Sequence, residues 1–96
     1  MVVETCTFRL TAGADDEELL AADQRVQVEL YSPHPGFVRR TTARGREGEW
    51  LVVMLWATDA HAEACDAVAS EHPAWQAFDA LVDGRTLDRR RYSTRD

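Results

Sequence analysis

The pattern of apolar and polar residues centres on the segment 50–57, WLVVMLWA, in which eight apolar residues follow one another. The run contains no glycine or proline, is too short for a typical helix, and is rich in valine, leucine and tryptophan. These features predict a strand that is buried on both faces. Because side chains alternate along a strand, one face of it is expected to carry Trp50, Val52, Met54 and Trp56.

Three other segments have the alternation or the β-branched content of strands. They cover residues 2–10, 37–44 and 86–93. The arginines of the segment 37–44 predict that one side of this strand faces water. Its connection to the strand 50–57 is the short polar segment 45–48, which predicts a β-hairpin.

The segment between the first two strands has the periodicity of a helix. Acidic residues at positions 15–18 form a first turn that complements the helix dipole. Proline and glycine in the segment 32–36 end the helix. Its apolar face is expected to consist of Leu19, Ala22, Val26 and Leu30.

A second helical region follows the central strand. Thr58 or Asp59 is expected to cap a helix over residues 60–69, which is rich in alanine. After an interruption, Pro73 begins a new helix that continues to about Val82. The residues of this helix expected to point inward are Trp75, Phe78, Leu81 and Val82.

The order β-α-β-β-α-β predicts a single domain over residues 1–96, of the α+β class with a ferredoxin-like split βαβ topology. In that fold a four-stranded antiparallel sheet carries its helices on one face. A chain of 96 residues has no further element for the other face of the sheet. A second copy of the chain, packed sheet to sheet, would cover that face, so the expected assembly is a homodimer.

Composition and charge argue against several classes of function. The net charge of −6 argues against nucleic-acid binding, and no segment has the roughly 18 apolar residues of a membrane span. The N-terminal segment carries acid where a signal peptide carries base, so we expect a mature cytoplasmic protein. Two cysteines, Cys6 and Cys65, do not make a disulfide framework and are expected to be reduced and buried.

Several motifs along the chain carry a resemblance to known proteins. They are Pro35-Gly36-Phe37 at the second strand, Trp50–Trp56 followed by Ala57-Thr58-Asp59, Gln76-Ala77-Phe78, Asp83-Gly84-Arg85-Thr86-Leu87, and Tyr92. Together they resemble the dimeric α/β-barrel proteins. The similarity is greatest to the small antibiotic-biosynthesis-monooxygenase-like (ABM) domains, in an uncharacterised branch of that group. It extends over nearly the whole chain.

The resemblance implies a homodimer whose two sheets form a barrel, with a pocket between sheet and helices in each subunit. Some such proteins oxidise polyketide aromatics without a cofactor, some degrade haem, and many have no known reaction. The haem-degrading members resemble this chain at Trp56, but they use an asparagine on the first strand where this chain has Cys6. We therefore expect no cofactor.

The expected function is that of a cofactor-independent monooxygenase acting on a flat apolar or aromatic small molecule. In such a reaction the substrate supplies the electrons to O₂, so the protein has to bind, orient and deprotonate it. One alternative is a non-catalytic ligand-binding or stress-associated domain. Another is a purely structural dimer whose pocket is filled by its own side chains.

The candidate binding residues are apolar or aromatic and come from three elements. Trp50, Met54 and Trp56 share one strand face, where they form either the wall of an apolar pocket or part of the core. Trp75 on the last helix and Cys6 on the first strand complete the set. Cys6 is expected to act as a small apolar residue and not as a nucleophile.

His72 is the candidate catalytic residue. An unperturbed imidazole pKa of about 6.5 would let it act as a general base near neutral pH. Its position before Pro73 is also that of a helix cap, which is the alternative role. His61 and Cys65 are four residues apart, a spacing that can hold a metal, but the lack of a close fourth ligand argues against a metal site.

Arginines gather on or beside the two predicted edge strands. They either bind an anion or serve as solubilising charges paired to acids such as Glu47, Glu49 and Asp88. These arginines are Arg39, Arg40, Arg44, Arg46, Arg85, Arg89, Arg90 and Arg91.

Overall fold

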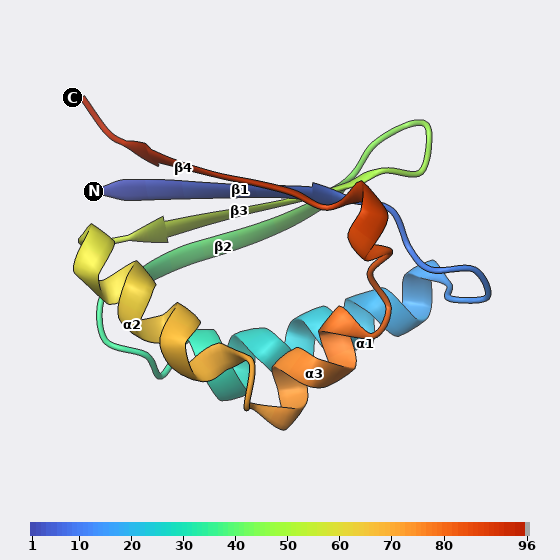
Figure 1. Ribbon diagram of the computed structural model, residues 1–96, viewed down its shortest axis with the longest axis horizontal. Coiled ribbons are helices and arrows are strands. Elements are labelled where there is room, and N and C mark those ends of the chain that lie inside the picture. Colours follow the sequence, from blue (N-terminus) through green and yellow to red (C-terminus); the bar gives the residue numbers. More distant parts are fainter. Residues whose placement is uncertain (96) are drawn as a thin grey trace.

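A computed structural model describes residues 1–95 of the chain. It consists of a four-stranded antiparallel sheet with all helices on one face (Figure 1). The elements are β1 (Val2–Phe8), α1 (Asp16–Val26), the π-helical turn η1 (Gln27–Tyr31), β2 (Phe37–Arg44), β3 (Trp50–Trp56), α2 (Asp59–Ala69), α3 (Pro73–Asp79), the 3₁₀ turn η2 (Gly84–Thr86) and β4 (Asp88–Ser93).

The strand order β2-β3-β1-β4 is that of the predicted ferredoxin-like fold, which is thereby confirmed. β1 and β3 are central, as their apolar content predicted, and the two arginine-bearing strands are the edges. The last helix is shorter than expected, since α3 ends at Asp79 and not near Val82. The last strand begins at Asp88, because the turn η2 takes up the residues before it.

The core lies between the sheet and the helices. From β3 it contains the predicted face, with Trp50, Val52, Met54 and Trp56 all buried. From α1 it contains Leu19 and Val26. α1 begins with a capping box in which Asp15 and Glu18 each bind the other's backbone N–H, so the acidic segment predicted to start this helix does so.

The end of the first helical segment is not an ordinary α-turn. The Ser32 N–H donates to the carbonyl oxygen of Gln27, five residues earlier, at 2.8 Å. This π-turn places one extra residue in the turn, and the neighbours Leu30 and Tyr31 are both buried as a result. The periodicity of the sequence predicted Leu30 on the buried face but gave no reason to expect Tyr31 beside it.

A β-bulge interrupts the pairing of β2 with β3. Phe37 pairs with Trp56, and the next pair joins Arg39 to Leu55, so Val38 is the extra residue. The bulge corrects the simple alternation expected for this strand, because Phe37 and Arg40 now lie on the same, helix-facing side. Arg40 is only 8% exposed, which also corrects its interpretation as a solvated edge charge.

Gly36 enters β2 with a positive φ of 81°, a conformation that favours glycine. A Cβ atom at this position would overlap the ring of His61 on α2. The Pro35-Gly36-Phe37 motif therefore allows the loop before β2 to pack closely against a helix.

The other face of the sheet is not covered by the chain's own helices (Figure 1). Leu51 on β3 and Tyr92 on β4 are exposed there, and Val53 and Leu55 are partly buried. The expectation that β3 is buried on both faces therefore depends on a second copy of the chain, which stays a prediction. Within residues 1–95, no helix has the length and apolar character needed to cross a membrane.

Candidate functional site

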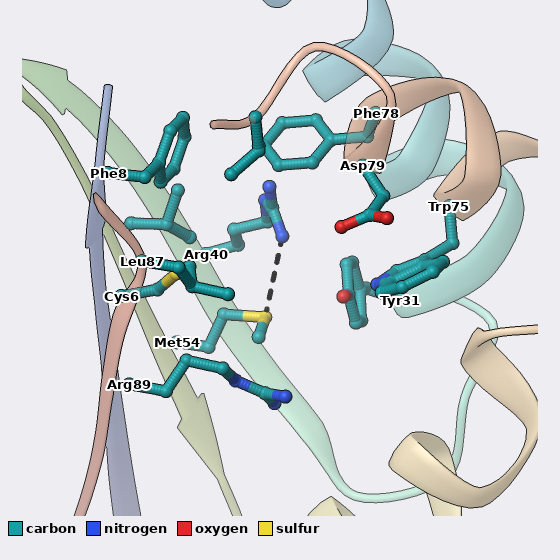
Figure 2. A pocket seen from close by; sticks show the side chains of 12 residues that line it. Cys6, Phe8, Tyr31, Arg40, Met54, Trp75, Phe78, Asp79, Leu87 and Arg89 are labelled. Atoms are coloured by element: carbon teal, nitrogen blue, oxygen red, sulfur yellow. Dashed lines mark hydrogen bonds between the residues drawn. The ribbon is translucent and has the colours of Figure 1, made fainter. Parts of the chain in front are cut away.

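A cavity of about 80 Å³ lies between the sheet and the helical layer, against α3 and the π-turn (Figure 2). Most of its wall is apolar or aromatic, with a few charged groups among the apolar ones. Its lining residues are Cys6, Phe8, Tyr31, Arg40, Val52, Met54, Trp75, Phe78, Asp79, Val82, Leu87 and Arg89.

Arg40 is the buried charge of this cavity. Its Nε and Nη2 atoms donate to Oδ1 of Asp23 on α1, at 3.2 and 2.7 Å. The hydroxyl of Thr42 donates to the same carboxylate oxygen at 2.8 Å. The guanidinium carbon lies 4.9 Å from the ring centroid of Tyr31 and 5.2 Å from that of Phe78, distances at which a cation interacts favourably with aromatic rings.

The third nitrogen of Arg40 has a weaker partner. Nη1 lies 3.7 Å from Sδ of Met54, and a thioether sulfur is a poor acceptor. Figure 2 shows this as the one hydrogen bond among the side chains that line the cavity. An N–H donor of a buried guanidinium therefore points into the cavity without an oxygen acceptor.

Tyr31 is placed beside Arg40 by the π-turn, and its hydroxyl points into the cavity (Figure 2). Burial raises the pKa of Tyr31 to about 12, because a phenolate would be poorly solvated there. Tyr31 therefore remains a neutral O–H donor at neutral pH.

Two further charges lie nearer the solvent. The Asp79 carboxylate comes from the last turn of α3 and points toward the cavity (Figure 2). Arg89 enters from β4, where its Nη2 lies 3.4 Å from Asp66 and 3.8 Å from Glu4. The cavity thus has a cation and a carboxylate at its mouth in addition to the buried Arg40.

Three of the five predicted binding residues line the cavity, namely Cys6, Met54 and Trp75. Burial raises the pKa of the Cys6 thiol above its usual value, so it stays protonated and lacks the thiolate of a reactive cysteine. Trp75 is half-buried and forms part of the wall on the α3 side.

The structure places the other two tryptophans in the core, away from the cavity lining. Trp56 is 1% exposed, donates from Nε1 to Oε1 of Glu4 at 2.8 Å, and packs edge-on against Tyr31 and Phe37. Trp50 is also buried, and its Nε1 is a buried side-chain donor for which residues 1–95 offer no acceptor. Of the two roles left open for these tryptophans, their contacts correspond to core packing.

His72 lies at the N-cap of α3, where its Nδ1 accepts a hydrogen bond from the backbone N–H of Ala74 at 3.0 Å. It does not line the cavity. His61 is likewise engaged locally, with Nδ1 2.7 Å from the hydroxyl of Thr58, the residue that caps α2. Within residues 1–95, no three His, Cys, Asp or Glu side chains are grouped as a metal site would require.

The polar half of the cavity was not predicted from the sequence; it consists of Tyr31, Asp79 and the buried Arg40. One signal was present. Asp23 lies four residues after Leu19 and three before Val26, so helical periodicity puts it on the apolar face of the helix. A carboxylate on a buried helix face requires a cationic or donor partner, which here is Arg40.

A second buried charge lies on the same sheet face, next to β4. Glu4 is 7% exposed, and its Oε2 accepts from Nε and Nη2 of Arg91 at 3.2 and 2.8 Å. Nη2 of Arg91 also lies 2.7 Å from Asp66, and its Nη1 lies 3.3 Å from Asp59. The carboxylates raise the pKa of Arg91, and an open groove of about 250 Å³ runs over this charged network.

Known proteins resemble this chain in structure, at low sequence identity. No protein-family model and no curated protein matches this sequence. Among solved structures, SnoaB of Streptomyces nogalater, a cofactor-independent oxygenase, matches with a TM-score of 0.82 and 21% identity over 99% of this chain and 93% of its own.

Two antibiotic biosynthesis monooxygenase structures match in the same way. One, a provisional assignment from Caulobacter crescentus, has a TM-score of 0.80 and 14% identity over 99% of this chain and 90% of its own. The other has a TM-score of 0.77 and 10% identity over the full length of both chains. Identities this low establish the fold and leave the reaction open. The chain therefore has the fold of the antibiotic biosynthesis monooxygenase structures, which is the fold that its sequence motifs predicted.

Proposed function

We propose that this protein is a homodimer that binds a flat aromatic molecule in the cavity and oxidises it with O₂ without a cofactor. One observation carries the proposal. The cavity combines aromatic walls with a buried cation, Arg40, and a carboxylate, Asp79, in a fold shared with a cofactor-independent oxygenase. The aromatic walls are Phe8, Tyr31, Trp75 and Phe78.

The size of the cavity limits the ligand. An engineered protein cavity of about 150 Å³ binds benzene, and the present cavity has only about 80 Å³. A ring can therefore enter only if side chains at the mouth move aside. Leu87 and Arg89 are exposed and Trp75 is half-buried, so these are the side chains that a ligand would displace.

The proposed reaction is balanced without a further reductant. A methylene carbon next to the aromatic ring, R₂CH₂, reacts with O₂ to give the carbonyl R₂C=O and one water, so the substrate supplies all the electrons. The protein has to remove a proton to make the substrate electron-rich. Asp79 is the carboxylate that lines the cavity, and we propose it as the proton acceptor in place of His72, which lies outside the lining.

The experiment is a screen of flat phenols and hydroxy-aromatic methylene compounds by tryptophan fluorescence, with oxygen uptake followed in parallel. Binding together with uptake supports the oxygenase. Asp79→Asn should then retain binding and lose most of the uptake, whereas Asp16→Asn, an exposed aspartate on α1, should change neither. Uptake that survives in Asp79→Asn would contradict the role of Asp79.

The alternative is a non-catalytic binding domain, which the small volume of the cavity favours because bound ligand would leave little space for O₂. Its signature in the same screen is fluorescence quenching without oxygen uptake for every ligand that binds. If no ring compound quenches the fluorescence, both the oxygenase and the binding-domain proposals are contradicted.

The homodimer is proposed from the uncovered sheet face. Leu51, Val53 and Leu55 form an apolar stripe there, and a second sheet packed on it would remove that stripe from water. We expect a dimer in light scattering at micromolar concentration. Leu51→Asp should shift it to monomer, whereas Leu20→Asp, at an exposed leucine on the outer side of α1, should not. A monomeric wild-type protein would contradict the proposal.

A further inference from the structure

The orientation of Arg40 is fixed on every side except the one facing the cavity. A guanidinium has five N–H donors. Two of them, one on Nε and one on Nη2, are directed at Asp23, which also accepts from the Thr42 hydroxyl. The rings of Tyr31 and Phe78 lie over the guanidinium. Three donors remain, and within residues 1–95 the only hydrogen-bond contact among them is from Nη1 to the Met54 thioether, a poor acceptor.

A second donor is directed at the same space. The hydroxyl of Tyr31 points into the cavity, and none of the other lining side chains accepts its proton (Figure 2). Tyr31 and Arg40 are each only 8% exposed, so both donors are reached chiefly through the cavity. Buried donors without good acceptors are costly and are rare unless something binds them.

We propose that Nη1 of Arg40 and the hydroxyl of Tyr31 together bind an anionic oxygen of the ligand. The ligand class is then planar rings that carry a phenolate or enolate oxygen. This inference rests on the proposed binding function of the cavity and assigns the chemical group that the ligand presents there.

The charges around the pair favour an anion that forms inside the cavity. Two donors that converge on one oxygen stabilise a negative charge more than a neutral carbonyl. Arg40 is balanced by Asp23, and Arg89 adds a cation at the mouth, while the Cys6 thiol is neutral. Asp79 would oppose an anion entering from water but can accept the proton of a neutral hydroxyl that enters first.

The test uses para-nitrophenol, whose anion is yellow and whose neutral form is not. Its neutral control is para-nitrotoluene, which has a similar shape and no hydroxyl. At a pH just below the pKa of the free probe, we expect a larger yellow fraction for bound than for free para-nitrophenol. We also expect the anion to bind at least about tenfold more tightly than para-nitrotoluene.

Two variants distinguish anion binding by Arg40 and Tyr31 from general binding of a ring in the cavity. Tyr31→Phe removes one hydroxyl and should weaken para-nitrophenolate about tenfold while leaving para-nitrotoluene unchanged. The double variant Asp23→Asn with Arg40→Gln removes both charges without leaving one unpaired, and should abolish the yellow shift. Arg25→Gln, at an exposed arginine of α1, is the matched control and should behave as wild type.

The two ligands also distinguish the failure of this inference from the failure of the proposed function. If para-nitrotoluene binds as tightly as para-nitrophenolate, or if Tyr31→Phe weakens both equally, the anion-binding pair is overturned while ligand binding remains. If neither compound binds, the inference is overturned together with the proposed function.

Discussion

Two buried charges lie in one row across the sheet and have very different surroundings. The pairing of the strands aligns Arg91, Glu4, Met54 and Arg40, in that order, from one edge strand to the other. Glu4 is 7% and Arg40 is 8% exposed. Met54 lies between them as an uncharged spacer.

The two charges differ in how completely their hydrogen bonds are made. Each oxygen of Glu4 has a donor, from Trp56 on one side and Arg91 on the other, and the network joins β1, β3, β4 and α2. Arg40 has a strong acceptor only on the side of Asp23. On the side of the cavity, its Nη1 has the Met54 thioether as its partner. A completely paired charge stabilises one arrangement of elements, whereas an incompletely paired charge next to a cavity is available for a ligand.

The largest predicted effect is that of Arg40→Met. The substitution keeps much of the volume but leaves Asp23, whose side chain is only 15% exposed, without its cation. We expect a loss of about 3 kcal/mol in the free energy of unfolding, measured by urea denaturation, and loss of phenolate binding.

The control for this change is Arg44→Met, which removes an exposed ion pair with Asp16 and should cost less than about 1 kcal/mol. Adding Asp23→Asn to Arg40→Met should recover part of the stability but none of the binding. Equal stability of Arg40→Met and wild type would show that the pair is not buried as described.

Glu4→Gln should have a smaller effect on stability and, unlike Arg40→Met, should leave ligand binding nearly unchanged. It removes the negative charge but keeps an acceptor, and Arg91 retains Asp66 and Asp59 as partners. We expect a loss of about 1–2 kcal/mol in the free energy of unfolding, with ligand affinity within about twofold of wild type. Glu63→Gln on the exposed side of α2 is the control. A large loss of affinity in Glu4→Gln would mean that the two charges act as one network.

Alkaline pH should affect the surroundings of Arg40 more than those of Glu4, because Tyr31 packs against the Arg40 guanidinium. Its folded-state pKa is raised to about 12 from the usual 10.0, chiefly by burial. Below pH 10 the folded and unfolded chains both keep the proton, so this contribution to stability is fully present. Between pH 10 and about 12 the unfolded chain ionises first, and the contribution is lost as the pH rises.

The loss attributable to Tyr31 amounts to about 1.4 kcal/mol per pH unit in that range. Tyr31→Phe has no phenol to ionise, so its free energy of unfolding, measured by urea titration, should fall less steeply as the pH rises. Cys6 and Cys65, whose pKa values are also raised by burial, titrate in both proteins and cancel in the difference. Parallel declines for the two proteins would contradict the burial of the phenol.

The fold could be predicted because its signals are local. The apolar run of β3, the capping residues of α1 and α2, and the proline at the start of α3 each indicated an element on their own. The apolar part of the cavity followed from the same periodicity, since Met54 and Cys6 lie on the helix-facing side of their strands.

The polar part of the cavity depends on two irregularities that periodicity does not show. A one-residue bulge at Val38 determines which arginine of β2 is buried, and a π-turn determines that Tyr31 is buried together with Leu30. Both insert one residue into a regular repeat, so each reverses or rotates the side chains that follow. Only the carboxylate of Asp23 on an apolar helix face indicated that a cation would be buried opposite it.

The smallest predicted effect concerns His72, which lies outside both charged clusters. His72→Ala removes the acceptor of the Ala74 N–H and should cost about 0.5–1 kcal/mol in the free energy of unfolding. His72→Asn restores a good cap but no imidazole, so it should recover the stability. If His72 only caps α3, both variants keep the oxygen uptake of the wild type for any substrate found. If it is the base, both lose it, and the restored cap in His72→Asn shows that the loss comes from the missing imidazole and not from a weakened helix.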